Sequence, residues 1–239
     1  MAPIVFGRQL VDGRAVDAGV VIDSEGPTAS AISERTTPVI SNPITGEWVA
    51  GINTADSADG ELSQGLILLQ PGSDGSPEHY HPTYEKRLEV LEGEVGFSVD
   101  GNHRTLSTEN SLVHNPGVQH RFWNESTEFA SLVGEARPAA KIEDVLTTRF
   151  GPAHDGKFAP EGNPPFFQAM AVARELATVT VFTPLPPPPV LQRLLSIVFT
   201  PIARRTGCQA TYPPISRSRS GHHASNNQCF LRPWKPIPP

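Results

Sequence analysis

Cysteine and long apolar runs are both scarce in this chain of 239 residues. The two cysteines, Cys208 and Cys229, have a spacing that fits neither a zinc-binding pattern nor a disulfide framework, and a single disulfide between them is left open. The sequence contains no run of the ~18 apolar residues that a membrane-spanning helix needs. Met1–Val5 also lack the charged start of a signal peptide. These absences predict a cytoplasmic protein without a membrane partner.

An excess of positive charge is missing as well. The formal net charge is -6 at pH 7 and the isoelectric point is about 5.7. Because nucleic-acid-binding domains usually carry a basic stripe, this balance predicts no nucleic-acid partner. The charge is uneven, since residues 213–239 hold four basic residues and no acidic one. We interpret that segment as a solvated, disordered tail, because it is rich in proline, serine, arginine and asparagine.

Apolar residues are also modest in number, at 38%, and there are 25 prolines. These figures fit one core domain with extensions better than a chain that is packed throughout. Residues 1–39 are weakly patterned and are expected to form an N-terminal arm. In residues 40–137, short apolar or alternating runs are separated by glycine, proline, asparagine and aspartate. Asp100–Gly101 marks a hairpin turn among them. Many short strands at regular spacing predict an all-β core, an antiparallel barrel or double-sheet roll.

Residues 138–212 change to the period of a helix and predict a C-terminal helical extension. The first helix is expected to start near Ile142 and stop at Gly151, and the second to begin at Pro164–Pro165. A third helix is expected at Val190–Phe199, ended by Pro201. We expect its apolar side to pack on the barrel or across a homodimer. That side consists of Leu191, Leu194, Leu195 and Val198.

Histidines supply the candidate chemistry. His79 and His81 are two residues apart at the start of a strand, where alternate side chains point the same way, so both imidazoles can bind one metal ion. Further along, a Pro116–Gly117 turn leads into a strand that begins with His120 and can bring a third imidazole to the same point. A structural alternative is that all three are hydrogen-bonded residues of a barrel wall.

These two stretches resemble the two motifs of the cupin superfamily. His79–Gly93 is similar to the first motif, in which His-x-His is followed by a glutamate and a glycine. Pro116–Asn124 is similar to the second, Pro-x-Gly-x-x-His-x-x-x-Asn. The resemblance covers roughly residues 40–137. It implies a cupin barrel with a divalent metal, iron first and nickel, zinc, copper or manganese as alternatives, bound by His79, His81, His120 and a glutamate.

Three positions depart from the cupin pattern. Asn115 and Glu109–Asn110 replace turn residues of the second motif, where asparagine is well tolerated. The third departure concerns the metal-binding glutamate, whose position is occupied by Lys86, with Glu85 one residue early. Leu88 and Val90 are the apolar members of this strand, so Lys86 should share their buried face and Glu85 should point outward. A bulge near Tyr84 would reverse this and make Glu85 the fourth ligand.

The fold hosts oxygenases, isomerases, decarboxylases and non-catalytic binders, so the resemblance implies little about the reaction. The leading hypothesis is a mononuclear oxygenase acting on a small organic molecule, with Lys86 as an acid or as a clamp for an anionic substrate. An isomerase or decarboxylase is the nearest variant. The alternative is a non-catalytic module that holds a small ligand, which the inward lysine favours.

Overall fold

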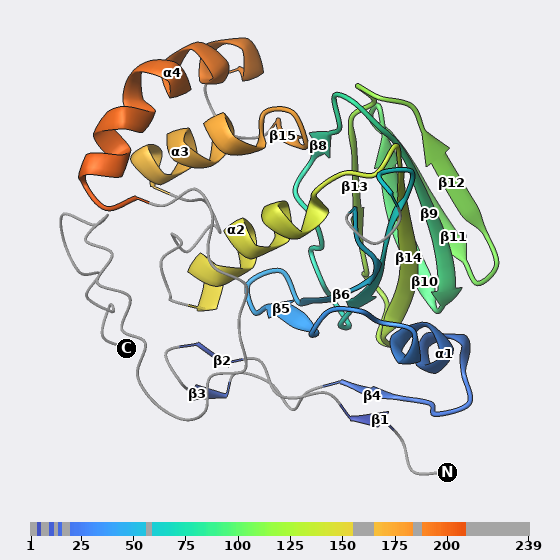
Figure 1. Cartoon of the computed structure of the whole chain (residues 1–239). Helices are drawn as coiled ribbons and strands as arrows, with labels where there is room; N and C mark the ends of the chain where they lie inside the picture. Colours follow the sequence, from blue (N-terminus) through green and yellow to red (C-terminus); the bar gives the residue numbers. More distant parts are fainter. Residues whose placement is uncertain are drawn as a thin grey trace.

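The computed structural model describes residues 20–55, 59–154, 165–183 and 188–208, and also short strands at residues 4–5, 10–11 and 14–15 (Figure 1). Cys229, His222, His223 and the predicted tail 213–239 lie outside the described residues. Within the described part, an antiparallel barrel occupies one side of the molecule and three helices extend from it. None of the described helices combines the length and apolarity that crossing a membrane requires.

The barrel consists of two antiparallel sheets, which confirms the predicted cupin double-sheet architecture. One has six strands in the order β12-β9-β14-β7-β6-β5, and the other has five in the order β11-β10-β13-β8-β15. The strands of the first sheet are β5 (Ile40–Asn42), β6 (Glu47–Asn53), β7 (Ser63–Leu69), β9 (Glu85–Glu92), β12 (Ser111–His114) and β14 (Ala130–Arg137). Those of the second are β8 (His79–Tyr80), β10 (Glu94–Val99), β11 (Asn102–Ser107), β13 (His120–Trp123) and β15 (Val181–Phe182).

The predicted hairpin turn joins β10 to β11. Asp100 and Gly101 both have positive φ angles, 47° and 77°, which the twist of a two-residue hairpin requires. The pairing of β10 with β11 runs without a register shift from Val99 and Asn102, beside the turn, to Glu94 and Ser107.

Residues 66–69 of β7, in the six-stranded sheet, are buried on both faces. Inside the barrel, Leu69, Leu88 and Leu132 pack in one core cluster. On the outer face, Leu66 and Leu68 of β7 pack in a second cluster beneath the short helix α1 (Pro27–Ser33) and strand β4 (Val21–Ile22). A strand that is buried on both faces has a continuous run of apolar residues, because neither of its faces contacts water. This explains the sequence of β7. The remaining short strands are β1 (Ile4–Val5), β2 (Leu10–Val11) and β3 (Arg14–Ala15).

The extension contains α2 (Ile142–His154), α3 (Phe166–Leu176) and α4 (Pro189–Arg205). The predicted helix ends at Gly151 and Pro201 are wrong, because α2 continues to His154 and Pro201 lies inside α4. Pro201 is on the exposed side of α4, where water can satisfy the carbonyl group left without its N–H donor. The start of α3 after Pro165 is as predicted.

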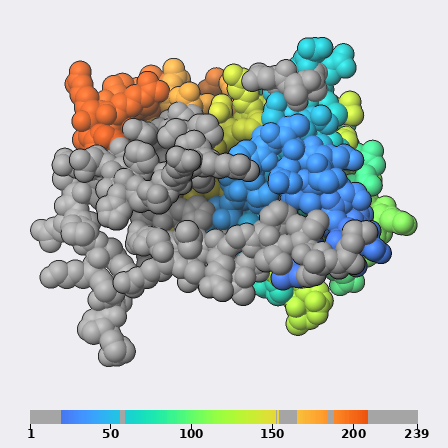
Figure 2. All heavy atoms as spheres, turned by 60° about the horizontal axis from the view of Figure 1, so that its bottom comes forward, coloured from blue at the N-terminus to red at the C-terminus, as the bar shows by residue number. Residues whose placement is uncertain are grey.

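Within this chain the apolar side of α4 does not pack on the barrel, and its packing across a homodimer stays a prediction. The residues of α4 that are buried against α3 are Gln192, Ser196, Thr200 and Ala203. Small side chains permit a close approach, and the Thr200 hydroxyl donates a hydrogen bond to the Met170 carbonyl at 3.1 Å. The apolar side of α4 is instead exposed, and Figure 2 shows this helix at the edge of the molecular surface.

Candidate metal centre

Three histidines meet inside the barrel. His79 of β8 and His120 of β13 are direct partners in neighbouring antiparallel strands, and His81 follows His79 by two residues. Their ring centroids are 4.4 to 4.9 Å apart, and ligand nitrogens of all three lie within 4.8 Å of one another. All three side chains are buried. The sequence therefore predicted their meeting point correctly.

Backbone carbonyls orient the three rings. Nδ1 of His79 lies 2.7 Å from the Pro77 carbonyl, and Nδ1 of His120 lies 3.0 Å from that of Val118. Nδ1 of His81 lies 3.1 Å from the Val179 carbonyl. Because a carbonyl can only accept, each contact favours a proton on Nδ1 and leaves the lone pair on Nε2. That is the tautomer in which Nε2 can bind a metal.

The electrostatic state of the rings agrees with a metal site. Burial lowers the pKa of His79 and His81 well below the ordinary value and that of His120 to about 4, so all three are neutral at pH 7. Nε2 of His81 is buried without a hydrogen-bond partner. An unpartnered nitrogen beside two other neutral imidazoles is a costly arrangement unless something accepts its lone pair. The residues therefore fit a divalent ion.

The expected fourth position is occupied by Lys86. Its side chain is buried on the same face of β9 as Leu88 and Val90, and it lines the cavity that contains the histidines. A Cβ atom placed on Gly134 would lie 2.9 Å from Lys86 Nζ, so the missing side chain at Gly134 makes room for the lysine. Burial lowers the pKa of Lys86 to about 8, and the nearby Glu135 opposes that shift.

Glu85 does not join the cluster. It is half-buried at the start of β9, opposite Arg137 in the register, and it does not line the cavity. Among the described residues, the group able to hold a metal consists of the three histidines alone. The register shift in the β9–β14 pairing lies between Ser131 and Leu132, far from Tyr84, so no bulge there turns Glu85 inward.

Two cavities adjoin the site. The inner cavity, about 300 Å³, contains the histidines and Lys86 and is capped by α2. The outer cavity, about 770 Å³, lies between the barrel and helices α3 and α4. Four residues line both cavities and so form the wall between them. These are Ser76, Arg149, Thr180 and Phe182.

Arg149 and Phe182 occupy this wall together. The Arg149 guanidinium lies 5.4 Å from the Phe182 ring, and the same ring lies 5.8 Å from that of His79. Arg149 also pairs with the buried carboxylate of Glu47 at 3.6 Å. Burial lowers the pKa of Arg149, and Glu47 opposes that shift.

The contributions of the extension to the site were not predicted from the sequence. Besides the Val179 carbonyl, the Thr180 hydroxyl oxygen lies 3.2 Å from Nδ1 of His81, and the hydroxyl oxygen of Tyr84, a barrel residue, lies 2.6 Å from it. No motif marks residues 179–182, because their role depends on β15 pairing with β8. His114 is buried with its ring 4.1 Å from that of His120. Neither of its ring nitrogens has a hydrogen-bond partner, and it does not line the inner cavity.

Comparison with known proteins agrees with this geometry. Residues 65–133 match the cupin domain family. The chain is 36% identical over 76 residues to the polyketide synthase protein CurC of Streptomyces cyaneus, covering 32% of this chain and 49% of that protein. It is 34% identical over 76 residues to the tetracenomycin polyketide synthase protein TcmJ of Streptomyces glaucescens, covering 32% and 50%.

A solved RmlC-like cupin from Shewanella frigidimarina is 22% identical, with a TM-score of 0.39, over 45% of this chain and 89% of that one. The chain spans about half the length of the curated relatives it matches. The family match ends before the helical extension begins.

Proposed function

Because the chain contains a cupin domain, we propose that it is a metal-dependent enzyme acting on a small organic molecule. One divalent ion would be held by Nε2 of His79, His81 and His120. The observation that carries the proposal is the meeting of three buried, neutral imidazoles whose ligand nitrogens lie within 4.8 Å of one another. Their Nδ1 atoms all face carbonyl oxygens, which leaves the Nε2 atoms available.

The proposed ion is iron, with nickel, zinc, copper and manganese as alternatives, since imidazole suits most of these metals. A bound divalent ion would polarise a substrate oxygen or activate dioxygen at the coordination positions that three imidazoles leave free. We favour an oxygenase. An isomerase or decarboxylase would use the same three ligands.

The charge of the site favours an anionic substrate. Three neutral imidazoles leave the charge of a divalent ion uncompensated, and Lys86 is a second basic group in the cavity, with a pKa of about 8 in the absence of a metal. A carboxylate, enolate or phenolate would therefore be attracted to the inner cavity, where Lys86 would hold and orient it. The names of the two curated relatives make polyketide-derived phenols and enols the first compounds to test.

A non-catalytic ligand-binding module is the second candidate. The observation that favours it is Lys86 itself, because a buried ammonium group stands where the cupin pattern has a metal-binding carboxylate. In this case the inner cavity would bind an anion through Lys86 without turnover.

Metal analysis of the tag-free chain separates the two. The His222→Ala/His223→Ala background removes a histidine pair that could scavenge ions. In that background we expect about one metal ion per chain by mass spectrometry. His79→Ala/His81→Ala should abolish binding, whereas His103→Ala, at an exposed position, should not. Metal below about 0.1 per chain after reconstitution would contradict the proposal. One ion per chain without oxygen consumption or product from phenolic and enolic acids would favour the binding module.

A further inference from the structure

Helix α4 carries its large apolar side chains on the outside of the molecule. Six of them are between 43% and 77% exposed. They are Val190, Leu191, Leu194, Ile197, Val198 and Ile202, and we call them the α4 stripe. Phe166 of α3 is also exposed, and its ring packs edge-on against Phe199 at 5.4 Å, so the apolar surface continues onto α3.

The orientation of α4 is set by its opposite face. Gln192, Ser196, Thr200 and Ala203 are buried against α3, so turning the stripe inward would expose a packed interface. Elsewhere in the described residues, the exposed large apolar side chains are Val21, Ile44 and Val113, which lie apart from one another on β4, in the turn between β5 and β6, and on β12. An apolar patch concentrated on one helix marks an interaction surface, whereas scattered residues need no explanation.

The charged residues of α4 itself are all basic. In the sequence, no acidic residue follows Glu175, while α4 has Arg193, Arg204 and Arg205 and four more basic residues follow it. Arg193 and Arg204 are about three helical turns apart, so they lie along one edge of the stripe. Arg204 pairs with Glu175 at 3.3 Å, but both side chains are exposed, and such pairs contribute little.

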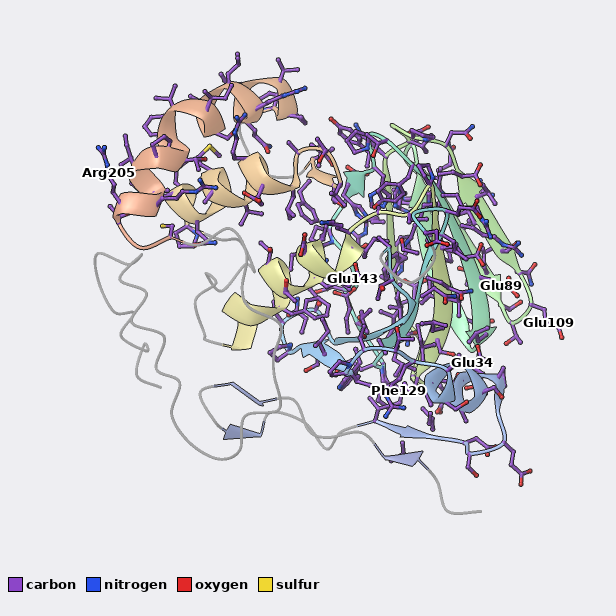
Figure 3. The ribbon with its side chains drawn as sticks, in the orientation of Figure 1. Glu34, Glu89, Glu109, Phe129, Glu143 and Arg205 are labelled. Atoms are coloured by element: carbon purple, nitrogen blue, oxygen red, sulfur yellow. The ribbon has the colours of Figure 1, made fainter. Side chains whose placement is uncertain are left out.

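The acidic surface lies elsewhere. Arg205 projects from the far end of α4, whereas Glu34, Glu89 and Glu109 lie on the barrel side of the molecule (Figure 3).

We propose that α4 docks on an anionic lipid surface. The α4 stripe would enter the boundary between headgroups and acyl chains, and Arg193, Arg204 and Arg205 would contact lipid phosphates. An exposed apolar face bordered by arginines is the pattern of a helix that lies in the membrane interface. The sequence-based expectation of no membrane partner rested on the lack of an apolar run long enough to span a membrane, which a helix lying in the interface does not need.

A second copy of the chain fits the surface less well. Pairing two α4 helices would bring arginines together with no carboxylate on either helix to neutralise them. The described barrel surface offers no concentrated apolar patch to receive the stripe, because its three exposed apolar residues are scattered. An anionic lipid surface would cover the apolar face of α4 and would also neutralise its arginines.

Vesicle co-sedimentation of the full chain tests the proposal. Binding to phosphatidylcholine vesicles containing about 30% phosphatidylglycerol should exceed binding to pure phosphatidylcholine by at least about tenfold, and should weaken at high salt. Leu194→Glu/Val198→Glu should reduce binding to the anionic vesicles at least about tenfold. Arg193→Gln and Arg205→Gln should each reduce it by roughly fivefold, as expected for arginines near an anionic surface.

Val21→Glu/Val113→Glu is the matched control, since it places the same charges at exposed apolar positions on the barrel and should leave binding unchanged. Leu194→Gln/Val198→Gln should also weaken vesicle binding, and its folding is checked by circular dichroism. This variant separates a specific loss of binding from a loss caused by misfolding. The proposal is overturned if the unmodified chain ignores anionic vesicles. It is equally overturned if both folded α4 variants bind as well as the unmodified chain, or if they merely convert a dimer to a monomer in light scattering while no form binds vesicles.

Discussion

Nδ1 of His81 lies 3.1 Å from the carbonyl oxygen of Val179, a residue 98 positions further along the chain. This contact joins the barrel to its C-terminal extension at the three-histidine cluster. The Thr180 hydroxyl lies 3.2 Å from the same nitrogen, and Tyr84 lies 2.6 Å from it on the other side. The extension is thus part of the environment that orients a metal ligand, although the family match excludes it.

Removing the Thr180 hydroxyl should therefore weaken metal binding. Thr180→Val keeps the shape of the side chain but deletes a polar contact with His81 Nδ1. Loss of such supporting contacts typically costs 10- to 100-fold in metal affinity, and we expect about tenfold here. Competition titration with a chromophoric chelator measures the change. Thr180→Ser should restore affinity, and a serine variant as weak as the valine variant would assign the effect to packing.

Replacing Lys86 by glutamate should raise metal affinity by at least about tenfold, which needs only ~1.4 kcal/mol. The change removes a like charge from the cavity and adds an oxygen donor. Turnover of an anionic substrate should fall at the same time. Lys86→Met, which removes charge without adding a ligand, should give a smaller gain.

Glu85→Gln is the control for that experiment, and it should leave metal affinity unchanged because Glu85 does not line the cavity. If Glu85→Gln abolished metal binding while Lys86→Glu had no effect, Glu85 would be the fourth ligand.

Acid should destabilise the metal-free protein through its buried histidines. Burial lowers the pKa of His114 from 6.5 to about 3, so the unfolded chain takes up its proton first as the pH falls. The free energy of unfolding should therefore decrease as the pH drops from about 6.5 towards 3. His114 alone should contribute on the order of 1–2 kcal/mol of that loss by about pH 5.

His114→Leu should flatten this dependence, because leucine neither titrates nor needs a hydrogen bond. Urea denaturation at several pH values, after treatment with chelator, gives the slope. His103→Leu alters an exposed histidine and should leave the slope unchanged, and equal slopes for all three proteins would contradict the role of burial.

Breaking the Arg149–Glu47 pair should lower the free energy of unfolding more than breaking a shorter ion pair at the surface does. Arg149 and Glu47 are 3.6 Å apart with side chains 15% and 3% exposed, so Arg149→Met removes the cation that pairs with a buried carboxylate. We expect a loss of roughly 3 kcal/mol in the free energy of unfolding, largely recovered in Glu47→Gln/Arg149→Met.

Arg87 and Glu89 provide the comparison. They are only 2.9 Å apart but nearly half exposed, so Arg87→Gln should cost less than about 1 kcal/mol. Similar losses for Arg87→Gln and Arg149→Met in urea denaturation would show that burial does not decide the strength of these pairs.

Local pattern was enough to predict the barrel, the histidine triad and the inward direction of Lys86. The last succeeded because Lys86, Leu88 and Val90 alternate within one unbroken stretch of β9, and strand geometry then determines which way each points. For α4, periodicity identified the apolar side but could not say what covers it. Ser196 and Ala203 allow α3 to approach closely, and this packing outweighed burial of the larger residues.

The contacts of Val179 and Phe182 could not be predicted, because they depend on a two-residue strand returning to β8 from far along the chain. Two-residue strands have too few side chains to show a period. Arg149 was missed for a related reason, since its partners Glu47 and Phe182 come from distant elements.

Strand β15 also has a consequence for where the chain can be cut. It is the outermost strand of the five-stranded sheet, next to β8. A fragment ending at Arg137 would leave the backbone groups of β8 open, beside the histidines, as a template for pairing with other chains. A truncated barrel should therefore tend to aggregate or to borrow a strand from a neighbour. The smallest well-behaved unit of this protein extends at least to Phe182.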